Sequence, residues 1–373
     1  MTTGVFDAAI IGAGVMGCST ALHLARGSMR VAIVDRGGIC REASGVNAGT
    51  LTLHMTRAAL IPYAIRGWEM WVSASQWLGC DVGVRATDGL SLAFTESEAA
   101  LLERRAQVRR EAGAPIELVP LARAREIEPG LSEKVRLAAH CPIDGFASAY
   151  LTGIAFRTAL VNTGVSVIEY SPVTGIERSN NSFVVRMRDG TALAARRVVL
   201  AGGVWLEEML RWFGLSIAVK VLINQLVITE RVRAVMRTVL SIANGLLSLK
   251  QFDNGTVLIG GGWQGIGDRE RGGVEIVPDN LIGNVRLARW VVPALADARV
   301  VRIWLGLEAE VADAMPMIGP VPGIMDAFVI GSVHSGYTSG PYMGRLLADL
   351  ILGHEPERAL FNPSRLIGQA AMH

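Results

Sequence analysis

Three glycines near the N-terminus have the spacing needed to bind a dinucleotide. Gly12, Gly14 and Gly17 form a Gly-x-Gly-x-x-Gly pattern, and Asp35 ends the next apolar run of the chain. Such glycines permit a tight turn and let a pyrophosphate approach the amides at the start of a helix, while the carboxylate can accept hydrogen bonds from ribose hydroxyls. A glycine-rich turn without a ligand is the competing interpretation.

The predicted elements around these glycines are those that the motif requires. Residues 6–11 form a short apolar run typical of a buried strand, a helical pattern follows through residues 21–25, and residues 30–35 form a second apolar run. The order strand, helix, strand predicts a βαβ unit and therefore parallel strands.

The polar segment after the second strand, residues 41–49, bears on which dinucleotide is bound. It reads Arg-Glu-Ala-Ser-Gly-Val-Asn-Ala-Gly, with small and hydrogen-bonding residues where a nicotinamide enzyme would begin its next helix. The segment resembles the flavin-binding segment of the D-amino-acid oxidase superfamily. Taken alone, it can also be a polar loop with chance glycines.

The C-terminal part of the chain resembles the same superfamily. Residues 304–306 read Trp-x-Gly, residues 313–320 read Asp-x-x-Pro-x-Ile-Gly-Pro, and residues 331–344 read Gly-x-x-His-x-Gly-Tyr-Thr-x-Gly-Pro-x-x-Gly. These patterns are similar to the ends of glycine oxidase, sarcosine oxidase and D-amino-acid dehydrogenase sequences. We expect a helix over residues 341–352, closed by Gly353. Residues 336–341 would supply amides at its start, where they would favour negative charge on a reduced flavin ring. The alternative is a tight turn followed by a helix with proline at its first position.

The resemblance implies FAD as the cofactor and a set of residues that bind it. No cysteine stands near residues 309–313, where sarcosine oxidases attach flavin covalently, so we expect a dissociable FAD. The four cysteines form no Cys-x-x-Cys pair, and no metal site is predicted. The implied FAD-binding residues are Gly12, Gly14, Val15, Met16, Gly17, Asp35, Arg36, Ala43, Ser44, Asn47, Ala48, Gly49, Val173, Ala201, Gly202, Gly306, Ser335, Gly336, Tyr337 and Thr338.

Four residues are candidates for contact with the substrate or the flavin: His54, His334, Glu308 and Tyr337. Glu308 stands where the resemblance implies an arginine that pairs with the substrate carboxylate. A carboxylate there would instead attract a guanidinium or ammonium group. The alternatives are that Glu308 points to solvent or pairs with Arg302, and that each histidine is a structural hydrogen-bonding group.

Within the superfamily, the chain looks most like the FAD subunit of heteromeric opine oxidases that act on octopine or nopaline. The resemblance implies partner subunits that carry an iron–sulfur centre and, in some cases, a further flavin, FMN, at the interface. Because this chain has no cysteine set for a cluster, we expect any cluster on a partner. The sequence also predicts a cytoplasmic protein, since no signal peptide or membrane span is evident.

Composition and pattern predict an α/β fold in two parts. Half of the 373 residues are hydrophobic, and Lys and Arg number 36 against 34 Asp and Glu, so neither general disorder nor nucleic-acid binding is indicated. We expect a Rossmann-like FAD-binding domain with an inserted antiparallel-sheet substrate domain. The expected boundaries are 1–83, 145–212 and 300–373 for the first domain, and 84–144 and 213–299 for the second.

These observations predict an FAD-dependent amine or amino-acid oxidoreductase, with a dehydrogenase favoured over a simple oxidase. The expected reaction oxidises the C–N bond of an opine to an imine, which water hydrolyses to an amino acid and a 2-oxo acid. Alternatives are an oxidase or dehydrogenase for a D-amino acid, glycine, proline or hydroxyproline, an NAD-dependent dehydrogenase, and a noncatalytic assembly subunit.

Overall fold

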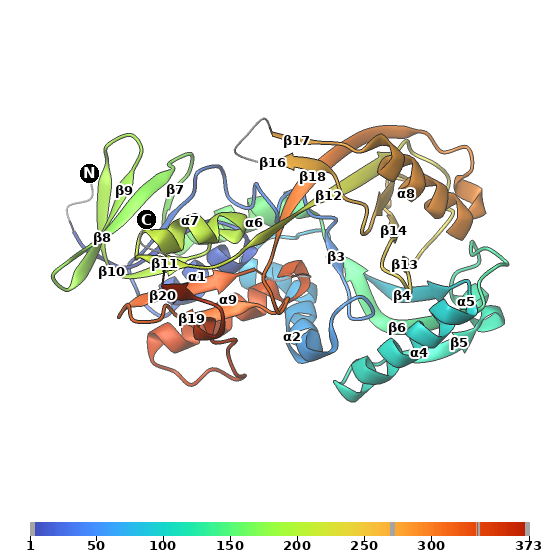
Figure 1. Cartoon of the computed structure of the whole chain (residues 1–373), viewed down its shortest axis with the longest axis horizontal. Helices are drawn as coiled ribbons and strands as arrows, with labels where there is room; N and C mark the ends of the chain where they lie inside the picture. The colour runs from blue at the N-terminus through green and yellow to red at the C-terminus, as the bar shows by residue number, and fades with distance from the viewer. Residues whose placement is uncertain (1–3, 269–272, 333, 335, 370–373) are drawn as a thin grey trace.

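Two sheets organise the protein, one on each side of the molecule in Figure 1. The computed structural model describes residues 4–268, 273–332, 334 and 336–369. The first sheet has eight strands, and the path β19-β20-β10-β1-β2-β7 is extended by β9 and β8 beside β10. These strands are β1 (Phe6–Ile11), β2 (Val31–Val34), β7 (Ser166–Ile168), β8 (Val173–Ser179), β9 (Ser182–Met187), β10 (Ala192–Leu200), β19 (Met317–Pro320) and β20 (Ala327–Gly331).

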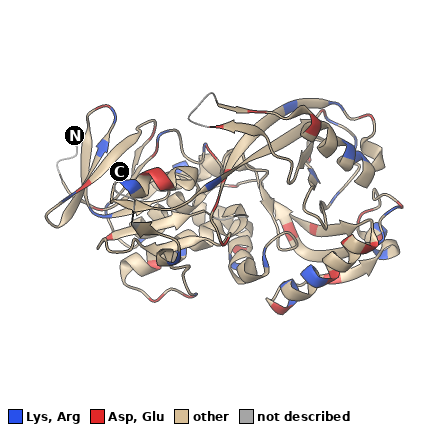
Figure 2. Cartoon of the chain, in the orientation of Figure 1, with Lys and Arg blue, Asp and Glu red and all other residues tan. Residues whose placement is uncertain are grey.

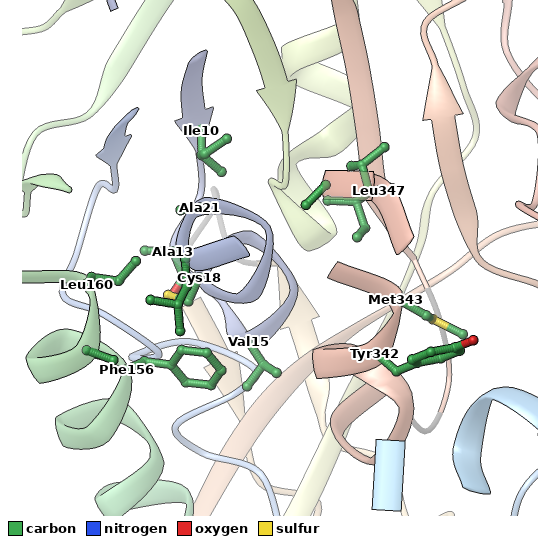
Figure 3. Packing of buried hydrophobic residues seen from close by; sticks show 14 of the residues in the cluster. Ile10, Ala13, Val15, Cys18, Ala21, Phe156, Leu160, Tyr342, Met343 and Leu347 are labelled. Atoms are coloured by element: carbon green, nitrogen blue, oxygen red, sulfur yellow. The ribbon is translucent and has the colours of Figure 1, made fainter. Parts of the chain in front are cut away.

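The centre of the first sheet is parallel, as the βαβ pattern predicts. Strand β1 pairs in parallel with β2 and β10, and β10 pairs in parallel with β20. Helices α1 (Val15–Arg26), α6 (Ala149–Asn162) and α9 (Gly336–Leu352) pack on this sheet, with the side chains of Cys18, Phe156 and Leu347 in one buried cluster (Figure 3). Gly344 permits the close approach of α1 and α9, because a Cβ there would lie 2.6 Å from Ser19 Cβ.

Helix α9 differs from its predicted form in where it begins. It starts at Gly336, so Pro341 lies inside the helix rather than in its first turn. A proline there has no N–H to donate to the carbonyl of Tyr337. The indole N–H of Trp71 donates to that carbonyl instead, at 2.9 Å. A partner on helix α2 (Ile61–Val72) therefore compensates for the missing bond within α9.

The second sheet has nine strands in the order β18-β12-β15-β14-β13-β4-β6-β3, with β5 paired to β6. Its pairs are antiparallel, as predicted, except that β13 and β4 run in parallel. Its strands are β3 (Thr50–Leu51), β4 (Arg85–Ala93), β5 (Glu117–Pro120), β6 (Leu137–Phe146), β12 (Lys220–Thr229), β13 (Val239–Ile242), β14 (Ser248–Gln251), β15 (Val257–Gly260) and β18 (Val300–Glu310).

Helices α4 (Glu96–Glu111), α5 (Leu121–Ile127) and α8 (Pro278–Val291) lie beside this second sheet (Figure 1). Helix α4 begins with the capping box that the sequence indicates, in which Thr95 and Glu98 each bond the other's backbone amide. The remaining elements are short: α3 (Ala74–Leu78), α7 (Leu206–Arg211), β11 (Leu215–Ser216), β16 (Ile266–Asp268), β17 (Gly273–Glu275), β21 (Gly368–Gln369), and the 3-10 turns η1 (Ala58–Leu60), η2 (Gly203–Trp205), η3 (Pro293–Leu295) and η4 (Pro363–Arg365).

Strand β18 belongs to the second sheet, whereas the expected domain boundaries place it in the first domain. It pairs with β12 from Glu310 opposite Lys220 to Val300 opposite Thr229. By these hydrogen bonds, residues 300–310 belong to the second sheet, although the sequence interpretation assigned them to the first domain. By the same criterion, Thr50 and Leu51 of β3 and residues 145–146 of β6 belong to the second sheet, although they were also assigned to the first domain. The remaining boundaries are still a prediction.

Positive and negative side chains are interspersed along the chain in Figure 2 rather than separated by sign. None of the helices in the described part of the chain is long and apolar enough to cross a bilayer.

Candidate active site

A cavity of about 580 Å³ is lined by residues from both sheets. At one end its wall is the glycine turn between β1 and α1, together with Asp35 and the polar segment that follows. At the other end the wall is formed by β12, β18 and the loop before α2. The cavity therefore connects the predicted nucleotide site with the sheet predicted to hold the substrate.

The three motif glycines have different roles in the turn. Gly12 has φ +109°, and a Cβ there would lie 2.3 Å from the Ala201 carbonyl oxygen. A Cβ on Gly17 would lie 2.1 Å from the carbonyl oxygen of Gly12. These two glycines let β1, β10 and α1 approach one another. A Cβ on Gly14 would meet only the Ser44 hydroxyl, at 3.3 Å, so Gly14 keeps the backbone open toward the cavity.

Asp35 and Ser44 hold the backbone around the start of α1. The Asp35 carboxylate accepts hydrogen bonds from the amides of Ala13, at 2.6 Å, and Gly37, at 2.7 Å. Burial raises the pKa of Asp35, and these two amides oppose that rise. The Ser44 hydroxyl accepts from the amide of Val15, the first residue of α1, at 3.0 Å. The residues present thus form a rigid cradle that fits a dinucleotide.

The Trp-x-Gly pattern attaches the polar segment to the second sheet. The indole N–H of Trp304 donates to the Val46 carbonyl at 2.9 Å. A Cβ on Gly306 would lie 2.9 Å from the Val46 side chain, so glycine makes room for that side chain. Thr338, at the start of α9, donates to the Thr50 carbonyl and accepts from the Thr52 amide, both at 3.2 Å. These bonds bring three distant segments to the middle of the cavity.

Most of the predicted site residues lie on this one cavity. Ser335 lies outside the described residues. The predicted residues that line the cavity are Gly12, Gly14, Val15, Met16, Gly17, Asp35, Arg36, Ala43, Ser44, Asn47, Ala48, Val173, Ala201, Gly202, Gly306, Glu308, His334, Gly336, Tyr337 and Thr338.

Gly49 and His54 do not line the cavity. Gly49 has φ +70°, and a Cβ there would lie 2.0 Å from the Ala147 carbonyl oxygen, so glycine is needed where two backbones cross. His54 is fully buried and its Nδ1 bonds the buried carboxylate of Asp144. Gly89 leaves room for this pair, because a Cβ there would collide with both side chains. The structure thus gives Nδ1 of His54 a partner inside the protein, as expected for a structural hydrogen-bonding group, while its buried Nε2 atom has no hydrogen-bond partner within the described residues.

Tyr337 contributes to the cavity wall, but its hydroxyl has a partner in the interior. The hydroxyl lies 2.7 Å from the Thr152 hydroxyl, and the ring stacks on Trp71 with centroids 4.7 Å apart. Burial raises the pKa of Tyr337 well above its ordinary value. Tyr337 is therefore held neutral at physiological pH, and its hydroxyl is engaged by Thr152.

Glu308 and His334 form an ion pair at the substrate end. Glu308 Oε1 lies 2.6 Å from His334 Nδ1, and Glu308 Oε2 accepts from the Asn224 amide at 2.7 Å. The Glu308 carboxylate raises the pKa of His334. Burial alone would raise the pKa of Glu308, but the hydrogen bonds from His334 and Asn224 lower it below the ordinary value. Glu308 is thus an ionised residue of the cavity wall, and its partner is not Arg302.

Sequence reasoning missed several polar residues at this end of the cavity. Arg57 and Glu310 both line it, with Arg57 Nη2 3.5 Å from Glu310 Oε2. Gln264 donates to the side-chain oxygen of Asn224 at 2.7 Å, which extends the chain of contacts to Glu308. Amide side chains within otherwise apolar β-type runs were the available signal for Asn224. No comparable local signal marked Arg57.

At the nucleotide end, the residue missed was Trp205, which the sequence did not distinguish from a packing residue. It lines the cavity, and the guanidinium of Arg36 lies 4.6 Å from its ring centroid. The pair combines a flat apolar surface with a positive charge, which suits a nucleotide base and its phosphates.

Comparison with known proteins decides the family. A family model described as FAD dependent oxidoreductase (DAO) matches residues 7–350. The chain belongs to this family. It is 29% identical to a glycine oxidase of Geobacillus kaustophilus (strain HTA426), over 98% of this chain and 99% of that protein. It is 27% identical to an opine oxidase subunit of Rhizobium meliloti, over 98% and 99% of the two chains. The crystal structure of glycine oxidase from Geobacillus kaustophilus superposes with a TM-score of 0.88 at 27% identity, covering 99% of this chain and all of that one.

Family membership confirms the predicted family, the predicted enzyme class and the predicted fold. The chain is an FAD-dependent oxidoreductase of the family to which amine and amino-acid oxidising enzymes belong, and its fold is the expected combination of a Rossmann-like part and an antiparallel sheet. The NAD-dependent alternative does not hold, because the family model spans both the glycine turn and the C-terminal motifs. The cradle around Gly14, Asp35 and Ser44 agrees with the same cofactor.

Proposed function

We propose that this protein oxidises the C–N bond of an amino-acid-derived secondary amine, an opine such as octopine or nopaline. The product is an imine, which water hydrolyses to an amino acid and a 2-oxo acid. Similarity to an opine oxidase subunit over 98% of the chain supports this proposal. The observation that carries it is the ionised Glu308 on the cavity wall, because an anionic group there suits a substrate with a cationic end.

Glu308 can bind a guanidinium group while it keeps its present partners. A carboxylate has about four lone-pair positions, and His334 and Asn224 occupy one on each oxygen. The guanidinium of an arginine-derived opine would use the remaining positions. The guanidinium would bind most tightly when His334 is neutral, because a protonated His334 already compensates the charge of Glu308.

FAD, when bound, supplies the chemistry by accepting a hydride from the carbon next to the substrate nitrogen. The residues that would hold it are the glycine turn with Asp35 and Ser44, the segment around Ala48, and the start of α9. The protein binds and orients the substrate and excludes water, and an amine bound in its neutral form needs no dedicated base.

We further propose that the chain is the catalytic subunit of a heteromeric complex in the cytoplasm. Two relatives are named as subunits of opine oxidases, which supports a multi-subunit assembly. The partner would carry an iron–sulfur centre, and FMN would bind at the interface. Electrons from FAD would then leave through the partner rather than pass directly to dioxygen.

A second candidate is oxidation of a small amino acid such as glycine, a D-amino acid, proline or hydroxyproline. The 29% identity to a glycine oxidase over nearly the full length favours it. The two candidates differ in what Glu308 must accommodate. A small amino acid offers no cationic group beyond its amine, whereas an opine made from arginine offers a guanidinium.

Anaerobic reduction of the bound FAD separates these candidates. The purified FAD-loaded chain is mixed with octopine, nopaline, glycine, D-alanine or proline, and loss of flavin absorbance is followed with time. We expect the opines to bleach the flavin at least about tenfold faster than the small amino acids at equal concentration. Faster bleaching by glycine or D-alanine would support the second candidate, and no bleaching by any of them would support a noncatalytic role.

The complex is tested by expressing the affinity-tagged chain in its native host and identifying the subunits and cofactors that co-purify. We expect a partner with an iron–sulfur centre, and turnover with dioxygen by the isolated chain well below that of the complex. Equal turnover by the isolated chain with dioxygen as the sole acceptor would show that no partner is needed.

A further inference from the structure

We infer that Arg57 binds the carboxylate of the substrate, in place of the strand arginine for which this chain has Glu308. This inference rests on the proposed function, because it names the residue that holds the acidic end of an amino-acid-derived amine. Arg57 comes from the loop before η1, so the cationic group would reach the cavity from a different segment of the chain than β18.

The guanidinium of Arg57 is only partly paired, and the side chain, which lines the cavity, is 36% exposed. Its Nη1 atom is buried and has no hydrogen-bond partner within the described residues. A buried donor without a partner is costly, so a rotation of the side chain that brought this atom to a ligand oxygen would gain a hydrogen bond. The Nη2 atom faces Glu310 at 3.5 Å, a distance that leaves this contact weak.

The charges around Arg57 also leave its positive charge available. Glu310 is shared, because Lys220 Nζ lies 3.4 Å from its Oε1 atom while Arg57 approaches Oε2. Glu308 has His334 and Asn224 as its partners. Each carboxylate near Arg57 therefore has another cation or donor, and a substrate carboxylate would add the missing negative charge.

A carboxylate is the group that suits this arrangement. Two guanidinium nitrogens can bind the two oxygens of one carboxylate in a planar, forked contact. Because Glu308 lies at the same end of the cavity, an anionic group is directed to Arg57 and a cationic one to Glu308. This pair of opposite charges would fix which end of the substrate amine faces each residue.

The test uses two probes that differ only in charge at one group. N-Acetylarginine carries a carboxylate and N-acetylargininamide carries a neutral amide, while both carry the guanidinium. Binding of each to the FAD-loaded protein is measured by titration calorimetry, so the readout does not depend on turnover. We expect the wild-type protein to bind the acid at least about tenfold more tightly than the amide.

Arg57→Gln should reduce this preference to about twofold or less, mainly by weakening binding of the acid. Arg57→Lys keeps the charge but not the fork, and it should give an intermediate ratio. The matched control is Arg302→Gln, since Arg302 lies on β18, is exposed and does not line the cavity. It should keep the wild-type ratio.

Two outcomes would overturn the inference. One is equal binding of the two probes to the wild-type protein, including no measurable binding of either. The other is a wild-type ratio retained in the Arg57 variants; if Arg57→Gln does not retain FAD, the Arg57→Lys ratio alone decides. Failure of the proposed function would instead be seen as no bleaching of FAD by opines, with the preference for the acid intact.

Discussion

The two ends of the cavity are built by different means. At the nucleotide end backbone atoms form part of the wall, because Gly12, Gly14 and Gly17 have no side chains and Asp35 is held by two amides. At the substrate end the wall combines charged and amide side chains with apolar ones such as Leu222 and Leu226, from β12, β18 and the loop before η1. The first end is set by local turns, whereas the second depends on strands that only the complete fold brings together.

Because of this difference, we expect substitutions to change cofactor binding and substrate preference independently. A substitution in the glycine turn acts on the shape of the backbone, and its effect should not depend on the substrate. A substitution among the charged residues leaves the cradle intact and should alter only which substrate is preferred. Three predictions test this separation, and a fourth concerns a residue outside the cavity.

Gly14→Val should have the largest effect, an almost complete loss of FAD. The added side chain would project from the turn into the cavity that the pyrophosphate must enter, while packing within the sheet is not disturbed. The measurement is FAD content per chain after purification, together with thermal unfolding. We expect FAD occupancy to fall to less than about a tenth of the wild-type value.

The control for this variant is Gly175→Val on strand β8. A Cβ on Gly175 would meet no atom within 4 Å, and this residue does not line the cavity, so FAD content should stay at the wild-type level. A full complement of FAD in the Gly14→Val protein would show that the turn does not hold the pyrophosphate.

Glu308→Gln should change substrate preference at the substrate end of the cavity without changing FAD binding. The substitution keeps the shape and removes the charge, so kcat/KM for guanidinium-bearing opines should fall about tenfold, or about 1.4 kcal/mol. Opines with a neutral side chain should change little, and FAD content should stay the same. Equal effects on both substrate classes, or none on either, would contradict a substrate role for Glu308.

Protonation of His334 should oppose binding of a cationic group by Glu308. The pKa of His334 is raised by the Glu308 carboxylate, so below that pKa the pair is compensated and above it the carboxylate is left with its full charge. Affinity for N-acetylargininamide should therefore rise severalfold between about pH 6 and pH 9, with a midpoint above the ordinary histidine pKa of about 6.5.

Calorimetric titration of this probe across the pH range measures that rise. The Glu308→Gln protein should show a flat profile, because its side chain no longer carries the charge that the histidine compensates. A pH dependence that persists unchanged in this variant would place its origin elsewhere in the protein.

The last prediction concerns the stability of the fold and Lys250, which does not line the cavity. Its effect should be the smallest of the four. Its amine bonds the Thr50 hydroxyl, and burial lowers its pKa to about 7. Between this value and the ordinary value of about 10.4 the unfolded chain holds the proton more tightly, so the free energy of unfolding rises with pH. From about pH 6 to pH 8 the gain should be about 1 kcal/mol.

Chemical denaturation of the wild-type and Lys250→Met proteins at several pH values measures this gain. The variant should lack the rise between about pH 6 and pH 8, so the difference between the two curves is the quantity of interest. Parallel curves would mean that Lys250 does not change its protonation on unfolding in this range.

The nucleotide end could be predicted from the sequence because its determinants are local. The glycine spacing, Asp35 and Ser44 lie within a short stretch, and the βαβ pattern around them limits the possible geometry. Glu308 was also predicted, because it departs from a pattern that fixes its position. Arg57 was not, since nothing in its own neighbourhood shows that the loop before η1 reaches β18.

Two residues show how a contact between distant segments outweighs a local signal. His54 follows the polar segment closely, yet its Nδ1 bonds Asp144, a partner far away in the sequence. Pro341 suggests a helix start, yet Trp71 supplies the hydrogen bond that allows proline inside α9. In both cases a contact between distant segments overrides the local signal, and one sequence alone does not show such contacts.

The pairing order of the first sheet also constrains when the protein can acquire its cofactor. Strand β1 is made first, but its neighbour β10 ends at Leu200, and β10 in turn needs β20, which ends at Gly331. Helix α9, which packs on α1, emerges from the ribosome later still. Contacts between such distant segments form slowly because a long loop must close first. The cradle for FAD is therefore completed only after α9 has begun to form, and a nascent chain that stops before Gly336, the first residue of α9, has no finished place for the cofactor.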